Sequence, residues 1–245
     1  MVQWNDQAII LSTRKYGESS GILSLLSKEH GLFNGLVRGI SSKKNCGIYQ
    51  VGNFIEATWK GRLSEHLGNF NAELITPNAA ILMGCPVRLA ALNSICTILE
   101  TTLPEREPAE QIYYHLKSFI QHLKDERHWQ LYYILLEIEL LSHLGFRLDL
   151  SSCAATGKTE NLAYISPKSG RAVCESAGEP YKSKLLKMPD FLKNDGNWRY
   201  DSEQINNGLE IGAYFLEKYI YKPQNKSLTV ARLRLYELVR EKEWG

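Results

Sequence analysis

Short apolar runs, separated by glycine or small polar residues, mark the first third of the chain. Five runs of strand length follow one another, at residues 7–13, 21–27, 31–39, 53–59 and 68–75. Five short strands in so short a segment favour a small barrel, because closure removes the exposed edges of a sheet. We expect an OB-like barrel, with an SH3-like barrel as the alternative. The polar, basic segment 40–52 is predicted to project as a loop.

After Pro77 the apolar residues recur at helical spacing. Stretches 87–103 and 108–124 each place an apolar stripe along one face, and 129–146 is apolar on most sides, which is typical of the central helix of a bundle. Two more helices are predicted at 202–220 and 228–242. The stripe residues are Leu89, Leu92, Ile95, Cys96 and Leu99 in the first stretch and Ile112, Leu116, Phe119, Ile120 and Leu123 in the second.

A stretch rich in Gly, Ser and Pro between the third and fourth predicted helices carries two cysteines at the spacing of a zinc site. Cys153 and Cys174 stand where two C-x-x-C turns would begin, and the interval between the turns fits the pattern C-x2-C-x15-20-C-x2-C. Thr156 and Ala177 occupy the second cysteine position of each turn. A structural zinc needs four N or S ligands. We therefore expect a loop that keeps two remnant ligand positions, and no bound zinc or other cofactor.

Composition narrows the class of protein. The 245 residues are 44% hydrophobic and 23% charged, with a net charge of +2, as in ordinary folded proteins. No secretory signal or apolar run of membrane-spanning length is present, and the five cysteines are odd in number, so we expect a cytoplasmic protein with reduced thiols and no membrane contact. Because no catalytic motif is recognisable, we expect no enzyme.

The basic residues are unevenly distributed. Between residues 38 and 62 there are five of them, Arg38, Lys43, Lys44, Lys60 and Arg62, against the single acid Glu56. A basic patch on an OB-type barrel is typical of nucleic-acid binding, in which cations follow the phosphates and bases stack on aromatics. A solvated surface explains the same run. Among the nearby aromatics Phe33, Tyr49, Phe54 and Trp59, only Tyr49, in the predicted loop, is a candidate for stacking.

Three stretches together resemble the bacterial DNA repair protein family RecO, whose members are recombination mediators. They are YGESSGILSLLSKEHGLFNGLVRGISSKK at residues 16–44, LLEIELLSHLGFRLDLSSCAATG at 135–157 and LAYISPKSGRAVCESAG at 162–178. The resemblance runs almost end to end, and the order of the stretches agrees with the three regions described above.

The resemblance implies an α+β protein with an N-terminal OB-fold β-barrel and an α-helical bundle that carries a small, degenerate zinc-ribbon-like insert. The expected boundaries are 1–80 for the DNA-binding OB-fold, 81–147 for the helical domain, 148–182 for the insert without a full ligand set, and 183–245 for the rest of the helical domain. Thr156 and Ala177 depart from the family's four-ligand pattern.

The family's function is likewise an expectation for this chain. It implies binding to single- and double-stranded DNA, annealing of complementary strands, and loading of recombinase on DNA coated by single-strand binding protein, in the cytoplasm at the nucleoid. The implied protein partners are RecR and the C-terminal tail of single-strand binding protein. The alternative is a non-catalytic adaptor that binds this tail, with a barrel that is merely structural. The barrel and basic patch do not distinguish DNA from RNA.

The resemblance also suggests DNA-binding residues. Arg38 matches the arginine of the family's R-G pair, and Lys43 and Lys44 fall in the basic stretch that follows it. Arg14, Lys15, Lys60 and Arg62 are further candidates on charge and position alone.

Overall fold

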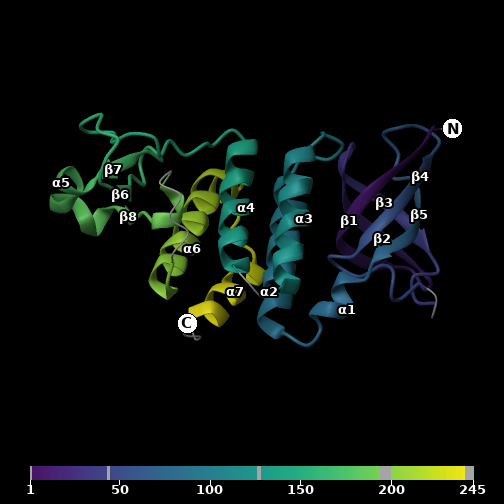
Figure 1. The fold of residues 1–245 in the computed structure, drawn as a ribbon. Helices are drawn as coiled ribbons and strands as arrows, with labels where there is room; N and C mark the ends of the chain where they lie inside the picture. The colour runs from purple at the N-terminus through teal and green to yellow at the C-terminus, as the bar shows by residue number, and fades with distance from the viewer. Residues whose placement is uncertain (1, 43–44, 126–127, 194–199, 241–245) are drawn as a thin grey trace. The chain divides into compact units, whose positions relative to one another are not determined.

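The computed structural model describes residues 2–42, 45–125, 128–193 and 200–240. The chain forms two compact units, one of residues 1–133 and 229–235 and one of residues 134–228 and 236–245 (Figure 1). Helices α4 (Trp129–His143) and α7 (Val230–Arg240) each contribute residues to both units.

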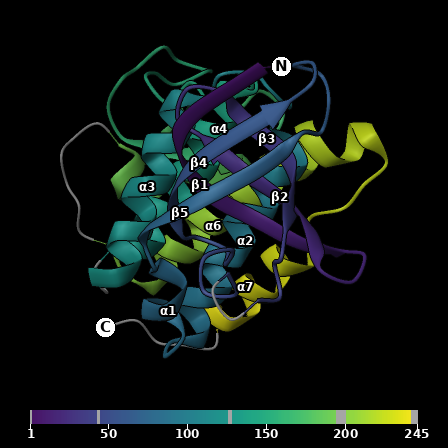
Figure 2. The same ribbon diagram turned by 90° about the vertical axis from the view of Figure 1, so that its right-hand side faces the viewer.

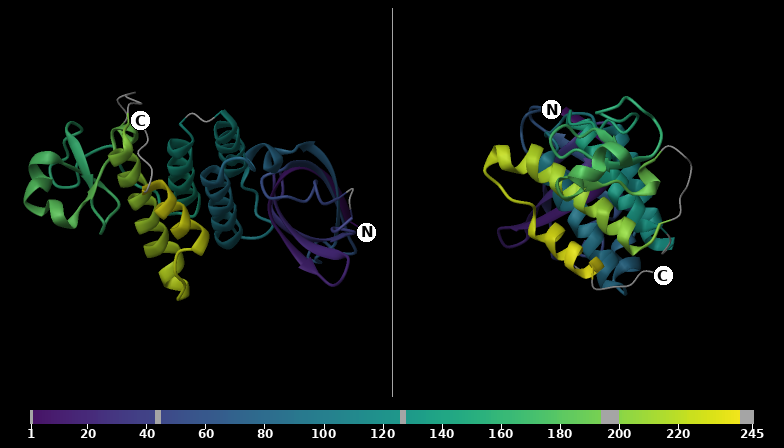
Figure 3. Two further views of the ribbon diagram at one scale, coloured as in Figure 1. Left: turned by 90° about the horizontal axis from the view of Figure 1, so that it is seen from below. Right: turned by 90° about the vertical axis from the view of Figure 1, so that its left-hand side faces the viewer.

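The first unit begins with a closed five-stranded barrel. Its strands are β1 (Val2–Tyr16), β2 (Ser20–Ser27), β3 (Gly31–Arg38), β4 (Phe54–Gly61) and β5 (Asn69–Thr76). They are ordered β1-β2-β3-β5-β4, and β1 closes the ring by pairing with both β2 and β4 (Figures 2 and 3). This order, with β3 parallel to β5, is that of an OB-fold, so the expected fold is confirmed over the SH3-like alternative.

Strand β1 is bent and pairs with two strands, β4 and β2. Its first half, from Val2 to Ile9, pairs with β4, whereas Ala8 to Tyr16 pairs with β2. The register shifts between Ile10 and Ser12, which marks a β-bulge. A bulge bends a strand and increases its twist, which is what closure of a small barrel requires.

Alternating side chains fill the barrel. Its core includes Leu23, Leu25, Phe33, Val37 and Trp59, all of them buried. The segment 40–52 was expected to project as a loop, but its two ends pack on this core through Ile40, Ile48 and Tyr49. The expectation of a projecting loop is therefore wrong for these residues: their apolar side chains gain more from burial under the barrel than from solvent.

Three further helices of the first unit follow the barrel. They are α1 (Asn78–Leu82), α2 (Pro86–Thr102) and α3 (Glu110–Asp125). Helices α2 and α3 confirm the predicted stripes, although Leu89 is only half-buried. The buried hydroxyls of Ser94 on α2 and Tyr133 on α4 are hydrogen-bonded at 2.7 Å, and Arg88 donates to the carbonyl of Leu123 at 2.7 Å.

The second unit combines helices with a small sheet of order β7-β6-β8. The strands are β6 (Leu162–Ile165), β7 (Ala172–Cys174) and β8 (Leu186–Lys187), so the sheet extends past residue 182, the expected end of the insert. The unit also contains α5 (Glu175–Gly178), α6 (Ser202–Leu216), a π-helical turn (Glu217–Tyr221) and 3-10 turns at Glu179–Lys184, Asp190–Leu192 and Lys222–Gln224. Helix α6 begins at an N-cap, Asp201, whose carboxylate accepts from the Gln204 N–H at 2.9 Å.

None of the helices in the described part of the chain is long and apolar enough to span a lipid bilayer.

Candidate nucleic-acid interface

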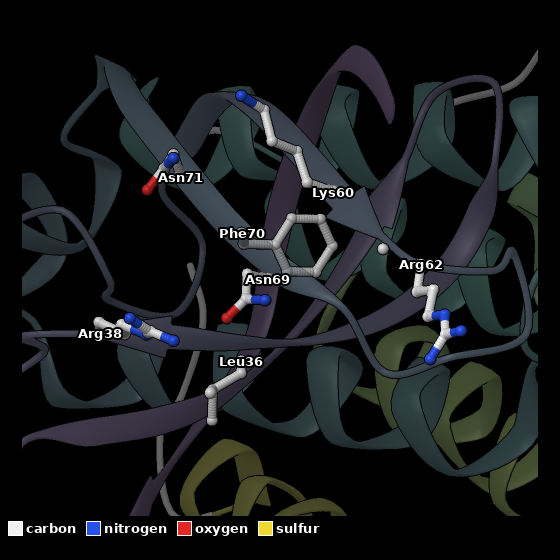
Figure 4. Close-up of a pocket in the computed structure, with 8 residues that line it drawn as sticks. Leu36, Arg38, Lys60, Arg62, Asn69, Phe70 and Asn71 are labelled. Carbon is white, nitrogen blue, oxygen red and sulfur yellow. The ribbon is translucent and has the colours of Figure 1, made fainter. Parts of the chain in front are cut away.

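A hollow of 720 Å³ opens on the barrel surface where β3, β4 and β5 meet. Three cationic side chains line it: Arg38 at the end of β3, Lys60 near the end of β4 and Arg62 just beyond β4 (Figure 4). The remaining lining residues are Leu36, Gly61, Asn69, Phe70 and Asn71. The hollow therefore combines a basic rim, two side-chain amides and an apolar floor.

Strand alternation places these side chains on the outside. On β4, Trp59 points into the core, so Lys60 points outward, and it pairs in register with Asn69 of β5. On β5, Phe70 lies in the core between the outward Asn69 and Asn71. The period of two thus separates the core residues from the polar rim.

The β4–β5 loop, which carries Arg62, is anchored at two points. The indole Nε1 of Trp59 donates to the carbonyl of Leu67 at 3.0 Å, and the guanidinium of Arg106 donates to the carbonyl of His66 at 3.1 Å. Arg106 also lies over the Phe33 ring, 5.0 Å from its centroid. The loop end of the hollow is therefore fixed to the barrel core.

Two glycines make room for the Trp59 ring. A Cβ on Gly61 or Gly68 would lie 2.4 Å from ring atoms of this indole. Gly68 also has a φ of +61°, a backbone conformation that side-chain-bearing residues rarely adopt. The close contact of the loop with the indole therefore depends on glycine at both positions.

A row of amides extends the polar surface beyond the hollow. Gln3 of β1 pairs with Lys60, and Asn5 pairs with Thr58, which in turn pairs with Asn71 of β5. These amides were not predicted as site residues. The signal available in the sequence was the alternation of amides with core residues at 3–5 and 69–71, which becomes a surface row only when the strand register is known.

The surface charge changes sign along the barrel. A second hollow, of 630 Å³, shares Arg38 and Asn71 with the first, but Glu56 and Glu73 also line it. An anionic ligand is therefore favoured at the Lys60 and Arg62 side and disfavoured beyond Asn71.

The structure gathers some of the predicted DNA-binding residues and separates others. Arg38, Lys60 and Arg62 share one hollow. Arg14 instead forms an ion pair with Glu100 of α2 at 2.7 Å, and Lys15 is exposed near the end of β1, opposite Gly21. Lys43 and Lys44 lie outside the described residues.

The expected stacking residue Tyr49 is not available to a base. Its side chain is buried in the barrel core, and burial raises the pKa of its hydroxyl group. Phe33, Phe54 and Trp59 are buried as well. The expectation for Tyr49 is wrong because the end of the predicted loop closes over the barrel.

The remnant zinc positions lie together in the second unit. The Cys174 N–H donates to Cys153 Sγ at 3.2 Å, and Thr156 Oγ1 lies 3.6 Å from Cys174 Sγ. Within the residues that the structure describes, no group of three or more His, Cys, Asp or Glu side chains is placed to hold a metal ion. Two sulfurs beside a threonine hydroxyl do not fit the four-ligand requirement of structural zinc.

The geometry is suited to binding a polyanion. Arginine forks match phosphate oxygens bidentately, lysine adds a point charge, and amides form hydrogen bonds to either phosphates or base edges. Because the cations are exposed at the rim and the aromatic floor is buried, the hollow is suited to contacts with the backbone rather than to stacking.

Comparison with known proteins shows the family to which the chain belongs. The family model for the N-terminal part of recombination protein O matches residues 1–78, and the model for its C-terminal part matches residues 85–229. DNA repair protein RecO of Bartonella tribocorum is 42% identical over 100% of this chain and 98% of its own length. The RecO proteins of Rhodospirillum rubrum (39% identical; 98% of this chain and 97% of the relative) and Mesorhizobium japonicum (41%; 91% and 88%) are similar. The chain belongs to the RecO family of DNA repair proteins.

Proposed function

We propose that this chain binds single- and double-stranded DNA through the hollow formed by β3, β4 and β5, and that this binding serves strand annealing and recombinase loading. The observation that carries the proposal is the convergence of Arg38, Lys60 and Arg62 on one hollow of an OB-fold. The net charge of the whole chain is only +2, so three cations at one hollow are a local concentration of charge.

Phosphate-based binding explains why annealing follows. Two complementary strands repel each other, and a protein that neutralises their phosphates lowers this repulsion without reading their sequence. The step makes and breaks base pairs but no covalent bond, so it needs no catalytic group, metal or nucleotide. We propose that the chain acts in this way, without cofactor, with RecR and the tail of single-strand binding protein as its partners.

The test is a salt series of binding to labelled single-stranded DNA, read by fluorescence anisotropy. On single strands, log K falls by about 0.7 per log unit of salt for each neutralised phosphate. If Arg38, Lys60 and Arg62 each neutralise one phosphate, their joint replacement by alanine lowers the slope by about 2. Between 1 M and 0.1 M salt, the affinity of the variant for DNA then rises roughly 100-fold less than the affinity of the wild type. The same variant is expected to anneal complementary strands more slowly.

A matched control removes the same charge elsewhere. Lys182, Lys187 and Lys193 form ion pairs in the second unit, at 2.6, 2.8 and 2.6 Å from their carboxylate partners. Their triple alanine variant is expected to keep the wild-type slope. An equal loss of slope in both variants would show that only net charge matters and would contradict the proposed site. An RNA strand of the same sequence tests selectivity for DNA.

The adaptor alternative has its own surface in the first unit. Tyr114 of α3 is an apolar side chain that is 46% exposed. Lys28 lies over the Tyr114 ring, 5.8 Å from its centroid. An acidic peptide with an apolar end requires this combination of cation and apolar surface.

Binding of an acidic, apolar tail peptide separates the two functions. If the chain is only an adaptor, the wild type binds the peptide but not DNA, and Tyr114→Ala together with Lys28→Ala abolishes peptide binding. If it is a mediator, the wild type binds both, and the Arg38, Lys60 and Arg62 variant loses DNA while it keeps the peptide.

A further inference from the structure

Two buried cysteines are neighbours in the second unit. Cys153 and Cys174 are 1% and 2% exposed. Thr156 Oγ1 lies 3.6 Å from Cys174 Sγ, and the Thr156 hydroxyl is among the groups that lower the pKa of the Cys153 thiol. The Cys153 sulfur in turn lies 3.2 Å from the backbone nitrogen of Cys174. The two side chains are therefore neighbours although 20 residues separate them in the sequence.

Backbone hydrogen bonds fix this approach. The Ala154 N–H donates to the carbonyl of Ala172 at 2.8 Å, which ties the two cysteine-bearing segments together. Around Cys153 a tight turn is closed by its own N–H to the carbonyl of Lys158 at 2.7 Å and by the Gly157 N–H to its carbonyl at 2.9 Å. These backbone hydrogen bonds hold the two cysteines next to each other.

The surroundings of Cys153 favour a negative charge on its sulfur. Burial raises the pKa of this thiol, but hydrogen bonds from the Cys174 backbone, the Thr156 hydroxyl and the Ala155 and Thr156 backbone outweigh it and lower the pKa to about 6. The thiolate is the nucleophilic form of cysteine. A hollow of 390 Å³ opens at Cys174, the neighbour of Cys153, and Lys158 and Ser176 also line it, so small solutes can approach the pair from the Cys174 side.

We propose that Cys153 and Cys174 form a peroxide-sensitive dithiol that closes reversibly to a disulfide. This inference is independent of DNA binding. It assigns a modification site to the positions that the degenerate insert retains.

The chemistry balances with hydrogen peroxide as the oxidant. The Cys153 thiolate attacks one peroxide oxygen, so the S–O bond forms while the O–O bond breaks, and hydroxide leaves. The resulting sulfenic acid is attacked by the Cys174 sulfur, which forms the S–S bond. The sulfenic oxygen leaves as water with the Cys174 proton. Cys153 and Cys174 together lose two electrons, and the peroxide gains them.

The disulfide product distinguishes this pair from an ordinary cysteine better than the rate of its reaction with peroxide does. At pH 7 a thiol of pKa about 6 is roughly 30-fold richer in thiolate than an ordinary thiol of pKa about 8.5. The lower basicity reduces the nucleophilicity of each thiolate by about tenfold, so the net advantage is only about threefold. What marks this site is that the second cysteine is its close neighbour in the fold, with the Cys174 backbone nitrogen 3.2 Å from Cys153 Sγ.

The experiment treats the full chain carrying Cys46→Ser with graded hydrogen peroxide, alkylates the remaining thiols, digests the protein and analyses the peptides by mass spectrometry. The expected result is a linked pair of Cys153 and Cys174 peptides, two hydrogens lighter than the sum of the free peptides, that a dithiol reductant separates. Cys96 is the internal reference, since burial raises the pKa of its thiol, and it is expected to stay reduced.

Variants separate the roles. Cys174→Ser is expected to leave a Cys153 sulfenic acid that a cyclic diketone traps. Thr156→Val is expected to slow disulfide formation severalfold, whereas Thr156→Ser keeps the hydroxyl and the wild-type rate. The proposal is overturned if the wild type gives Cys153 sulfinic acid with Cys174 still a free thiol, or if both thiols survive peroxide that has already oxidised Cys96.

Discussion

Trp59→Phe is the sharpest test of how the β4–β5 loop is held. The indole is 1% exposed, and its Nε1 donates to the carbonyl of Leu67 at 3.0 Å. Phenylalanine removes this hydrogen bond, worth about 1 kcal/mol. It also removes two buried ring carbons, worth about 1.6 kcal/mol at ~0.8 kcal/mol for each carbon. The expected loss in the free energy of unfolding is therefore about 2–3 kcal/mol.

The assay is urea unfolding followed by far-ultraviolet circular dichroism, fitted with a separate transition for each of the two units. The matched control is Trp4→Phe: Trp4 is half-buried and stacks on His30 at 4.2 Å, and the expected loss is about 1 kcal/mol or less. If Trp59→Phe costs less than about 0.5 kcal/mol, the indole is not anchored as described, because even a single hydrogen bond contributes that much. With the anchor weakened, DNA binding through Arg62 is expected to fall while the spectrum of the folded protein is unchanged.

Three other changes have defined outcomes. Gly31→Ala is expected to prevent folding of the barrel, because Gly31 has φ +68° and a Cβ there would lie 1.8 Å from the carbonyl oxygen of Glu107; a wild-type thermal melt would refute this. Asp6→Ala is expected to cost about 3–5 kcal/mol in urea unfolding, since it removes a buried carboxylate that accepts from the Ser27 hydroxyl and a backbone N–H, whereas a loss below 1 kcal/mol would contradict that network. Folding lowers the pKa of the Cys153 thiol to about 6. The thiolate therefore adds to the free energy of unfolding fully above the ordinary thiol pKa, and this contribution is lost as pH falls through about 6. The rate of Cys153 alkylation by iodoacetamide is expected to titrate with the same midpoint.

The barrel was predictable because strand alternation and turn residues are local signals. All five strands coincide with or include the apolar runs, and their order is that of the OB-fold, which was preferred over the SH3-like alternative. The fate of Tyr49 was not predictable in the same way, since a polar, basic segment carries no signal that its end returns to a core formed by residues far away in the sequence.

The candidate site was predictable in part for the same reason. Charge and position indicated Lys60 and Arg62, and the resemblance indicated Arg38. These three cations and the amides Asn69 and Asn71 line one hollow because β3 pairs with β5. In this parallel pairing Leu36 lies opposite Asn69. The pairing of Arg14 with Glu100, 86 residues away, is likewise a tertiary fact that composition does not contain.

The division of α7 between the two units has a consequence for synthesis on the ribosome. All five barrel strands are complete by Thr76, so the barrel can close early. The first unit also needs residues 229–235, in which Arg232 is 1% exposed and lies 5.5 Å from the Tyr133 ring. These residues emerge roughly 160 residues later, about 10–30 s at ~5–20 residues per second. During synthesis the helices of the first unit are therefore exposed until residues 229–235 have been made. Binding by a chaperone would be most useful in this period.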